Sequence, residues 1–348
     1  AGIIRDDILL AVDGVPVAGK DVAGVRAMLD GKIGSEVTLD LIRPGGKKES
    51  LTIKREEFAV ESVEGLYRNA AGRWVYRLGD DCAYVRITEF VPDTLEHVQS
   101  ALRGLVPLRG VVLDLRDNPG GEFNVSLAVA DLFLREGTIV TVFSRNASPH
   151  KYQALENGTL PGDIPVVILI NGKSASGAEI VAGSLAVNDR AVLIGTRTRG
   201  KGCMQKIIEL DGGLGLINLT TSEFYVGDDQ PVAKRGIAPN LDLPLGNGSE
   251  PAAVQALQDE LARVRLEIEL SGPRPATAPA ATEPTTSPML ARERLLELDN
   301  QLAAATKLVQ DPQAVNDIIK GARQMRQAAK TAATRPTTST SQTAVVNK

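Results

Sequence analysis

The sequence predicts a mixed α/β protein (α/β or α+β), and two observations lead to this fold class. Short β-branched apolar runs, at 111–116 and 165–170, are typical of strands buried on both faces of a sheet. Segments with helical apolar spacing alternate with them, at 94–105, at 124–134 and after Ser176. Alternation of this kind indicates a layered core whose connecting loops are available for chemistry.

Composition excludes several functional classes. The 348 residues suffice for a sizeable core, and their formal net charge of −4 lacks the basic excess of a nucleic-acid-binding protein. Cys82 and Cys203 are the only two cysteines, and they form neither a disulfide framework nor a CxxC site. No His, Cys and carboxylate residues recur at metal-ligand spacing. We therefore expect no nucleic acid partner, no metal and no cofactor, and no run reaches the roughly 18 apolar residues of a membrane span.

Residues 1–57 read as a small β-rich module. Apolar and polar residues alternate at 8–12, 37–42 and 51–53, and a Pro-Gly-Gly turn at 44–46 separates two of these runs. Asp21 is placed to cap a short helix that ends near Leu29. The alternation of strands and helices then predicts a second domain over 60–245.

The composition changes again after Gly246. Two apolar stripes with 3-4-3-4 spacing predict a helix at 246–270 and a helical segment at 289–330, joined by a Pro/Thr/Ala linker at 271–288. Residues 331–348 read as a disordered tail. We expect the region from about Gly246 to be dispensable for chemistry, with its helices either packing onto the body or supporting homo-oligomer formation.

The stretch at 171–205 carries the chemistry. Ser176 lies where a buried strand turns onto a helix, and Gly177 and Ala178 leave space beside its hydroxyl. Such a turn exposes backbone N–H groups to a developing oxyanion and lets a serine act as nucleophile. The tetrapeptide starting at Ser176 is equally typical of a capping box, with Glu179 at its fourth position.

A nucleophilic serine needs a base. His97 and His150 have no neighbouring acidic pattern, so we expect surface or packing roles for both. Lys201, between Gly200 and Gly202, could accept the proton if burial or a nearby positive charge favoured its neutral form. Residues 195–201 also match seven positions of a phosphate-binding P-loop, but position 202 is Gly instead of Ser or Thr, which disfavours nucleotide binding.

Four motifs together resemble one enzyme family. NGKSASGAEIVAG and GTRTRGKGCMQ, with DLRDNPGG upstream and GIAPN downstream, resemble the carboxyl-terminal processing peptidases, or tail-specific proteases. The resemblance implies a crotonase-like ββα core at 60–245. It also implies that residues 1–57 are a PDZ-like module, whose first strand and carboxylate-binding loop would precede Ala1.

The same resemblance implies specific roles for residues. Ser176 and Lys201 would form a catalytic dyad with the family's 25-residue spacing, which selects Ser176 over Ser174, and Gln205 would orient Lys201. Backbone groups would form the oxyanion hole, at Gly120, Gly121 and Gly177.

The activity implied is that of a serine endopeptidase. It would cleave protein or peptide substrates near exposed C-termini through an acyl-enzyme, in an extracytoplasmic location. Two other interpretations stay open: an inactive PDZ-containing scaffold protein and a P-loop-like nucleotide-binding protein.

Overall fold

The computed structural model describes residues 3, 7–56, 61–69, 71–79, 81–105, 107–145, 147–155, 160, 164–210, 215–246, 293 and 295–334. The chain divides into two compact units, 1–60 and 61–348, and each is described here by itself. The fold is mixed α/β, which confirms the predicted class. None of the described helices combines the length and the apolar composition that a membrane span requires.

The first unit is a four-stranded antiparallel sheet with one helix. Its strands are β1 (Ile8–Val12), β2 (Val15–Pro16), β3 (Glu36–Ile42) and β4 (Lys48–Lys54), in the order β2-β1-β3-β4. Helix α1 (Val22–Leu29) begins where expected, because the Asp21 carboxylate accepts the Gly24 N–H at 2.8 Å. Four buried side chains form a small core: Val12, Val37, Leu39 and Leu41.

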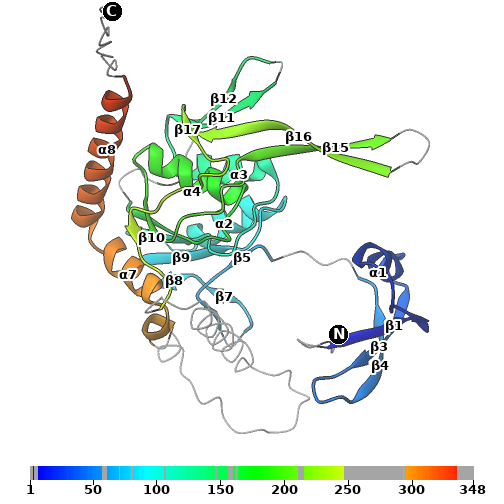
Figure 1. Cartoon of the computed structure of the whole chain (residues 1–348). Helices are drawn as coiled ribbons and strands as arrows, with labels where there is room; N and C mark the ends of the chain where they lie inside the picture. The colour runs from blue at the N-terminus through cyan, green and yellow to red at the C-terminus, as the bar shows by residue number, and fades with distance from the viewer. Residues whose placement is uncertain are drawn as a thin grey trace, which may run out of the picture. The chain divides into compact units, whose positions relative to one another are not determined.

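The second unit is organised around a seven-stranded sheet (Figure 1). Five of its strands are parallel and lie in the order β18 (Leu241–Asp242), β14 (Val192–Gly195), β13 (Val166–Ile170), β10 (Gly110–Asp114) and β9 (Cys82–Ile87). Strands β5 (Val63–Glu64) and β8 (Arg77–Leu78) pair antiparallel with β9. A separate short hairpin joins β6 (Tyr67–Arg68) to β7 (Trp74–Val75).

Helices cover both faces of this sheet. Helices α2 (Thr94–Arg103), α3 (Phe123–Phe133) and α4 (Gly177–Val187) pack on one face, where Val111 and Leu113 lie. Helix α7 (Asn300–Val309) packs on the other face, against Val112 and its neighbours. Because side chains of a strand alternate between faces, both faces of β10 are apolar and the strand reads as one continuous hydrophobic run.

A second sheet flanks the first. It has the order β12 (His150–Gln153), β11 (Thr138–Ser144), β16 (Gly215–Val226) and β15 (Cys203–Leu210), and β17 (Gln230–Pro231) pairs with β16. Residues 211–214, between β15 and β16, lie outside the described residues. Strands β15 and β16 form a long hairpin, which extends away from the helices in Figure 1.

The C-terminal segment is an integral part of this unit. Its apolar stripe, the one predicted at 289–330, contributes buried Leu295, Leu302, Ala305 and Val309 to the core under the sheet. Helix α8 (Pro312–Thr334) follows and is tied to Asp189 by ion pairs from Arg323 and Arg326. The helical segment therefore packs onto the body, which is one of the two outcomes expected for it. That the region beyond Gly246 is dispensable for chemistry stays a prediction. The helix predicted at 246–270, the linker at 271–288 and the tail beyond residue 334 lie outside the described residues.

Candidate active site

Three adjacent parallel strands bring the predicted residues together. Strands β10, β13 and β14 are neighbours in the sheet, and each is followed by a loop at its carboxyl end. These loops carry Gly121, Ser176 and Lys201 respectively. Sites in parallel sheets form at this edge because consecutive loops meet there. The three residues line one pocket of about 320 Å³, whose lining also includes Gly177, Gln205, Cys203 and Asn218.

Ser176 sits on a strained turn. Its backbone has φ 55° and ψ −115°, a region that residues other than glycine rarely adopt. Such strain persists where the surroundings hold it, and it is typical of functional positions. Ser176 is the N-cap of α4, and the Glu179 side chain accepts its backbone N–H in a capping box.

Ser174, two residues earlier, is engaged in structure. It is fully buried, its hydroxyl donates to the Leu115 carbonyl at 2.7 Å, and it accepts the Asn171 N–H at 3.0 Å. A hydroxyl held in this way is not available as a nucleophile. The geometry therefore favours Ser176 of the two, in agreement with the choice made from its spacing to Lys201.

The loop after β10 is fixed beside Ser176 by one buried amide. Asn118 donates to the Ile87 carbonyl at 2.9 Å and accepts the Gly120 N–H at 2.8 Å. An added Cβ at Gly120 would lie 2.7 Å from the Ser176 Cβ, so only glycine allows this approach. Because the Gly120 N–H is taken by Asn118, the backbone donors without a partner among the described residues are those of Gly121 and Gly177.

A buried carboxylate joins the serine turn to the lysine loop. Glu179 is 0% exposed, and its Oε2 accepts the N–H of Ser176 at 2.9 Å and of Lys201 at 2.8 Å. Its Oε1 accepts the Thr198 hydroxyl and the Gly200 N–H, both at 2.6 Å. Hydrogen bonds to an ionised acceptor are among the strongest in proteins, so these four hold the backbones of the two predicted catalytic residues in one arrangement. The capping box predicted this contact with Ser176 only.

The lysine side chain itself is not buried. Lys201 is exposed, and its ammonium has no hydrogen bond or ion pair among the described residues. This differs from the burial that we considered for a lysine base, since Lys201 lines the pocket at an exposed position. Gln205, expected to orient Lys201, instead accepts a hydrogen bond from the Asn218 amide at 3.3 Å.

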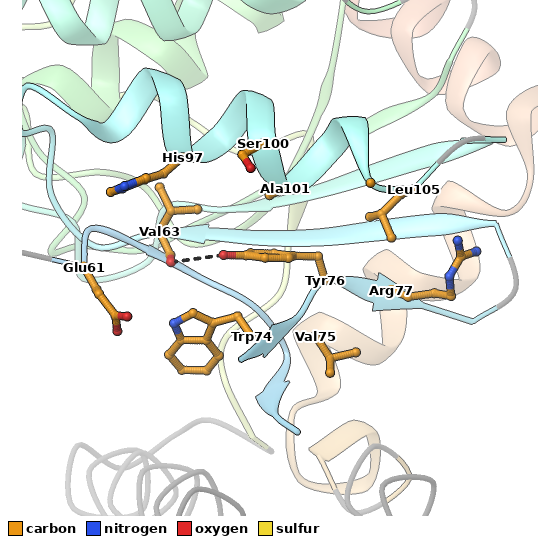
Figure 2. Close-up of a pocket in the computed structure, with 11 residues that line it drawn as sticks. Glu61, Val63, Trp74, Val75, Tyr76, Arg77, His97, Ser100, Ala101 and Leu105 are labelled. Carbon is orange, nitrogen blue, oxygen red and sulfur yellow. Dashed lines mark hydrogen bonds between the residues drawn. The ribbon is translucent and has the colours of Figure 1, made fainter. Parts of the chain in front are cut away.

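The histidines lie elsewhere. His97 lines a different hollow of about 440 Å³, together with Trp74 and Tyr76, as Figure 2 shows. His150 lies in β12, with its ring 4.6 Å from that of Tyr152 in an edge-on contact. No histidine is among the described residues that line the Ser176 pocket. Among the described residues that line the pocket, Lys201 is therefore the one with a basic side chain that could accept a proton from Ser176.

The P-loop interpretation loses its physical basis. A phosphate loop offers backbone N–H groups to phosphate and leads into a helix. Here the N–H groups of Gly200 and Lys201 donate to the Glu179 carboxylate, and strand β15 follows. An anion could not share these donors with a buried carboxylate. Among the described residues there is also no group of three or more His, Cys, Asp or Glu side chains that could hold a metal ion.

A buried ionic network supports the loop after β10 from behind. Arg116 donates to Asp114 at 2.6 Å and to Asp299 at 2.7 Å, and it also bonds Gln301. Burial alone would raise the pKa of the Asp114 carboxyl, but the attraction and hydrogen bonds of Arg116 outweigh it and lower that pKa. Sequence analysis missed Asp299 and Gln301, because a partner 183 residues away leaves no local pattern.

The fold and the pocket define an α/β protein with a serine on a strained turn, beside a lysine and two unpaired backbone donors. Residues 81–243 match the model of peptidase family S41. A carboxy-terminal-processing protease of Bartonella bacilliformis is 34% identical over 248 residues, which are 69% of this chain and 54% of that protein. The carboxyl-terminal-processing protease of Synechocystis sp. is 32% identical over 263 residues, which are 73% of this chain and 60% of that protein.

A solved structure titled photosystem II D1 C-terminal processing protease is also similar. It shares 27% identity, covers 71% of this chain and 66% of its own, and gives a TM-score of 0.47. The family model and the two sequence relatives show that the chain belongs to peptidase family S41, which confirms the resemblance to the carboxyl-terminal processing peptidases. It spans between 54% and 60% of the length of the two relatives above.

Proposed function

We propose that this chain is a serine endopeptidase that cleaves protein substrates near their C-termini. The observation that carries the proposal is the Glu179 carboxylate, which bonds the backbones of Ser176 and Lys201 at 2.9 and 2.8 Å beside a single pocket. A serine that serves only as a helix cap would not need its N–H tied to a lysine loop. The relatives are named carboxyl-terminal-processing proteases, and from these names we infer that cleavage lies near the C-terminus of the substrate.

The proposed chemistry is acyl transfer by a dyad. The Ser176 Oγ attacks the carbonyl carbon of the scissile bond while the neutral Lys201 amine takes its proton. Lys201 then gives that proton to the leaving amine, and the C–N bond breaks to leave an ester at Ser176. The same lysine takes a proton from water, which attacks the ester. As the bond from the acyl carbon to the Ser176 Oγ breaks, the lysine returns that proton to Oγ and the acid leaves. No step of this sequence requires a metal or nucleotide.

The unpaired backbone N–H groups beside Ser176 can bind the oxyanion. We assign the oxyanion hole to the N–H groups of Gly121 and Gly177, since neither has a partner among the described residues. Gly120 contributes differently: its own N–H is bonded to Asn118, and its missing side chain lets the loop approach Ser176. Loss of one such donor typically costs about 100-fold or more in kcat.

Gln205 and the first unit complete the proposal. Gln205 lines the pocket with Lys201 and can orient the Lys201 amine when Gln205 exchanges its hydrogen bond with Asn218 for one with that amine.

The first unit, with a capped helix beside an antiparallel sheet, suits a PDZ-like module that recruits substrate tails, and we propose a crotonase-like arrangement for the second unit. An extracytoplasmic location accords with relatives named as chloroplastic and with bacterial ones, and any homo-oligomer would form through the C-terminal helices.

The test is cleavage of a protein with an unstructured C-terminus, followed by mass spectrometry of the products. We expect internal cuts near the C-terminus by the unmodified chain and none by Ser176→Ala or Lys201→Ala. The cleavage should persist in the presence of a chelator. Binding of the same protein without any cleavage would instead favour a scaffold.

A further inference from the structure

Strand β15 is the edge of its sheet. It pairs with β16 on one side, and no described residue pairs with its other side. An edge strand of eight residues presents a row of unpaired backbone groups that another extended chain can join. Most proteins shorten or cover such an edge, but this one lies on the long hairpin that extends away from the helices in Figure 1.

The same strand begins inside the candidate active site. Its first three residues, Cys203, Met204 and Gln205, line the pocket with Ser176 and Lys201. A peptide whose carbonyl sits at Ser176 could therefore leave the pocket alongside β15. Continuity with the pocket distinguishes β15 from β12, the other edge of this sheet, whose residues are absent from the described lining.

The hairpin also exposes apolar side chains. Large apolar residues are exposed at eight described positions of the second unit, and four of them lie on this hairpin: Ile208 (39%), Leu216 (66%), Ile217 (44%) and Leu219 (49%). The remaining four are scattered over other elements: Phe143, Leu155, Leu241 and Met325. Clustered exposed apolar residues typically mark an interaction site, whereas single ones need no explanation.

We propose that the β15–β16 hairpin is a substrate-docking arm. An unfolded segment of the protein substrate joins the free edge of β15 as an added strand, and its apolar side chains contact Ile208, the exposed apolar residue of that strand. The hydrogen bonds to β15 are made by backbone, so they accept many sequences, while the apolar contacts favour segments that are normally buried in folded proteins. The occupant is extended polypeptide, since the edge leads into the Ser176 pocket. This inference deepens the proposed peptidase function and rests on it.

Peptide binding separates docking from chemistry. The probe is a fluorescent peptide of about ten residues, long enough to pair along this strand, with Val, Leu and Ile at alternate positions. Its affinity is measured by fluorescence anisotropy with the full chain carrying Ser176→Ala, so that the result does not depend on cleavage. We expect Ile208→Ser, on the edge strand itself, to weaken binding about tenfold, because it removes the apolar contact. The matched control is Met325→Ser, an exposed apolar residue on α8, which should bind as the parent does.

Backbone methylation of the peptide tests the added strand itself. Because alternate N–H groups of a strand face the same neighbour, N-methylation should weaken binding at every second position and have little effect in between. Equal effects at all positions, or hairpin variants that bind like the parent, would overturn the proposal. So would a hairpin variant that loses self-association on sedimentation while keeping its peptide affinity, because the arm would then join two copies. If the peptide binds as expected and the unmodified chain never cleaves it, the docking arm stands and the peptidase function fails.

Discussion

The two walls of the Ser176 pocket are built in opposite ways. On the serine wall, buried side chains hold the backbone: Asn118 fixes the glycine loop, and Glu179 fixes the turn at Ser176. On the lysine wall, the side chains of Lys201 and Gln205 are exposed, and the Lys201 amine has no partner among the described residues, although Glu179 holds the Lys201 N–H. The proposed nucleophile and oxyanion donors are thus positioned in advance, whereas the proposed base has its main chain fixed and its amine without a partner among the described residues.

Removing the amine should give the largest effect on function and little effect on folding. We expect Lys201→Met to lower peptidase activity by at least about 1000-fold, as loss of a catalytic group does. Its free energy of unfolding should change by less than about 0.5 kcal/mol, because the side chain is exposed. Activity assays and urea melts measure both quantities.

The control for this prediction is Lys173→Met, three residues before Ser176. Lys173 is 65% exposed and lies 3.6 Å from Asp117, so its loss should leave activity nearly unchanged. If Lys201→Met kept its activity, the lysine wall would have no catalytic role.

Disturbing the serine wall should affect stability as well as activity. In Glu179→Gln, one of the two carboxylate oxygens becomes an amide group that cannot accept, so two of four buried hydrogen bonds are lost. We expect the variant to lose about 3 kcal/mol of unfolding free energy, since each buried donor left unpaired is costly. Urea melts measure this loss. Activity should fall because either the Ser176 and Lys201 N–H groups or the Thr198 and Gly200 donors of the lysine loop lose their acceptor.

Glu122→Gln, at an exposed position that precedes α3, is the matched control and should unfold like the parent. A Glu179→Gln protein with the stability of the parent would contradict the contrast between a fixed and a free wall.

The support behind the serine wall can be tested at two capping aspartates. Asp299 caps α7 and also pairs with buried Arg116, whereas Asp311 caps α8 at an exposed position. We expect Asp299→Ala to cost about 3 kcal/mol, because it breaks a buried ion pair. Asp311→Ala should cost only about 1 kcal/mol, the usual value of a cap. Equal losses in thermal or urea unfolding would mean that the C-terminal segment does not brace the loop after β10.

The smallest expected effect is on how the free energy of unfolding changes as pH falls. Arg116 lowers the pKa of Asp114 below its unfolded value, so as pH falls the unfolded chain binds the proton first. The stabilising contribution of Asp114 is therefore complete above about pH 4, the unfolded value, and is lost as pH falls through the folded pKa. We expect the difference in unfolding free energy between the parent and Asp114→Asn to shrink between pH 6 and pH 3, as urea melts would report. A difference independent of pH would contradict this role for Arg116.

Much of the fold could be predicted because its signals are local. The runs at 111–116 and 165–170 became β10 and β13, and the helices at 94–105 and 124–134 became α2 and α3 within two residues. The apolar stripe through Leu295 and Leu302 likewise predicted a helix, whose place in the core under the sheet only the structure reveals. Periodicity identifies which face of an element is buried, but not the surface that it packs against.

The candidate site, like the fold, could be predicted from sequence only where its signals are local. Ser176 and Lys201 could be selected from spacing and from their small neighbours, and the structure brings both to one pocket. The bonds of Glu179 to the lysine loop, the pairing of Arg116 with Asp299 and the use of the Gly120 N–H by Asn118 could not be predicted. Each of these joins residues by a hydrogen bond whose partner is chosen by tertiary packing or by loop geometry, so no periodic pattern records it.

The central claim is that Ser176, held on its strained turn, is the nucleophile. It is tested most directly by labelling the chain with a fluorophosphonate probe and mapping the modified peptide by mass spectrometry. The account predicts phosphonylation of Ser176, none at the buried Ser174 two residues away, and no labelling of Ser176→Ala. Labelling that persists in Ser176→Ala, or that maps to Ser174, would contradict it.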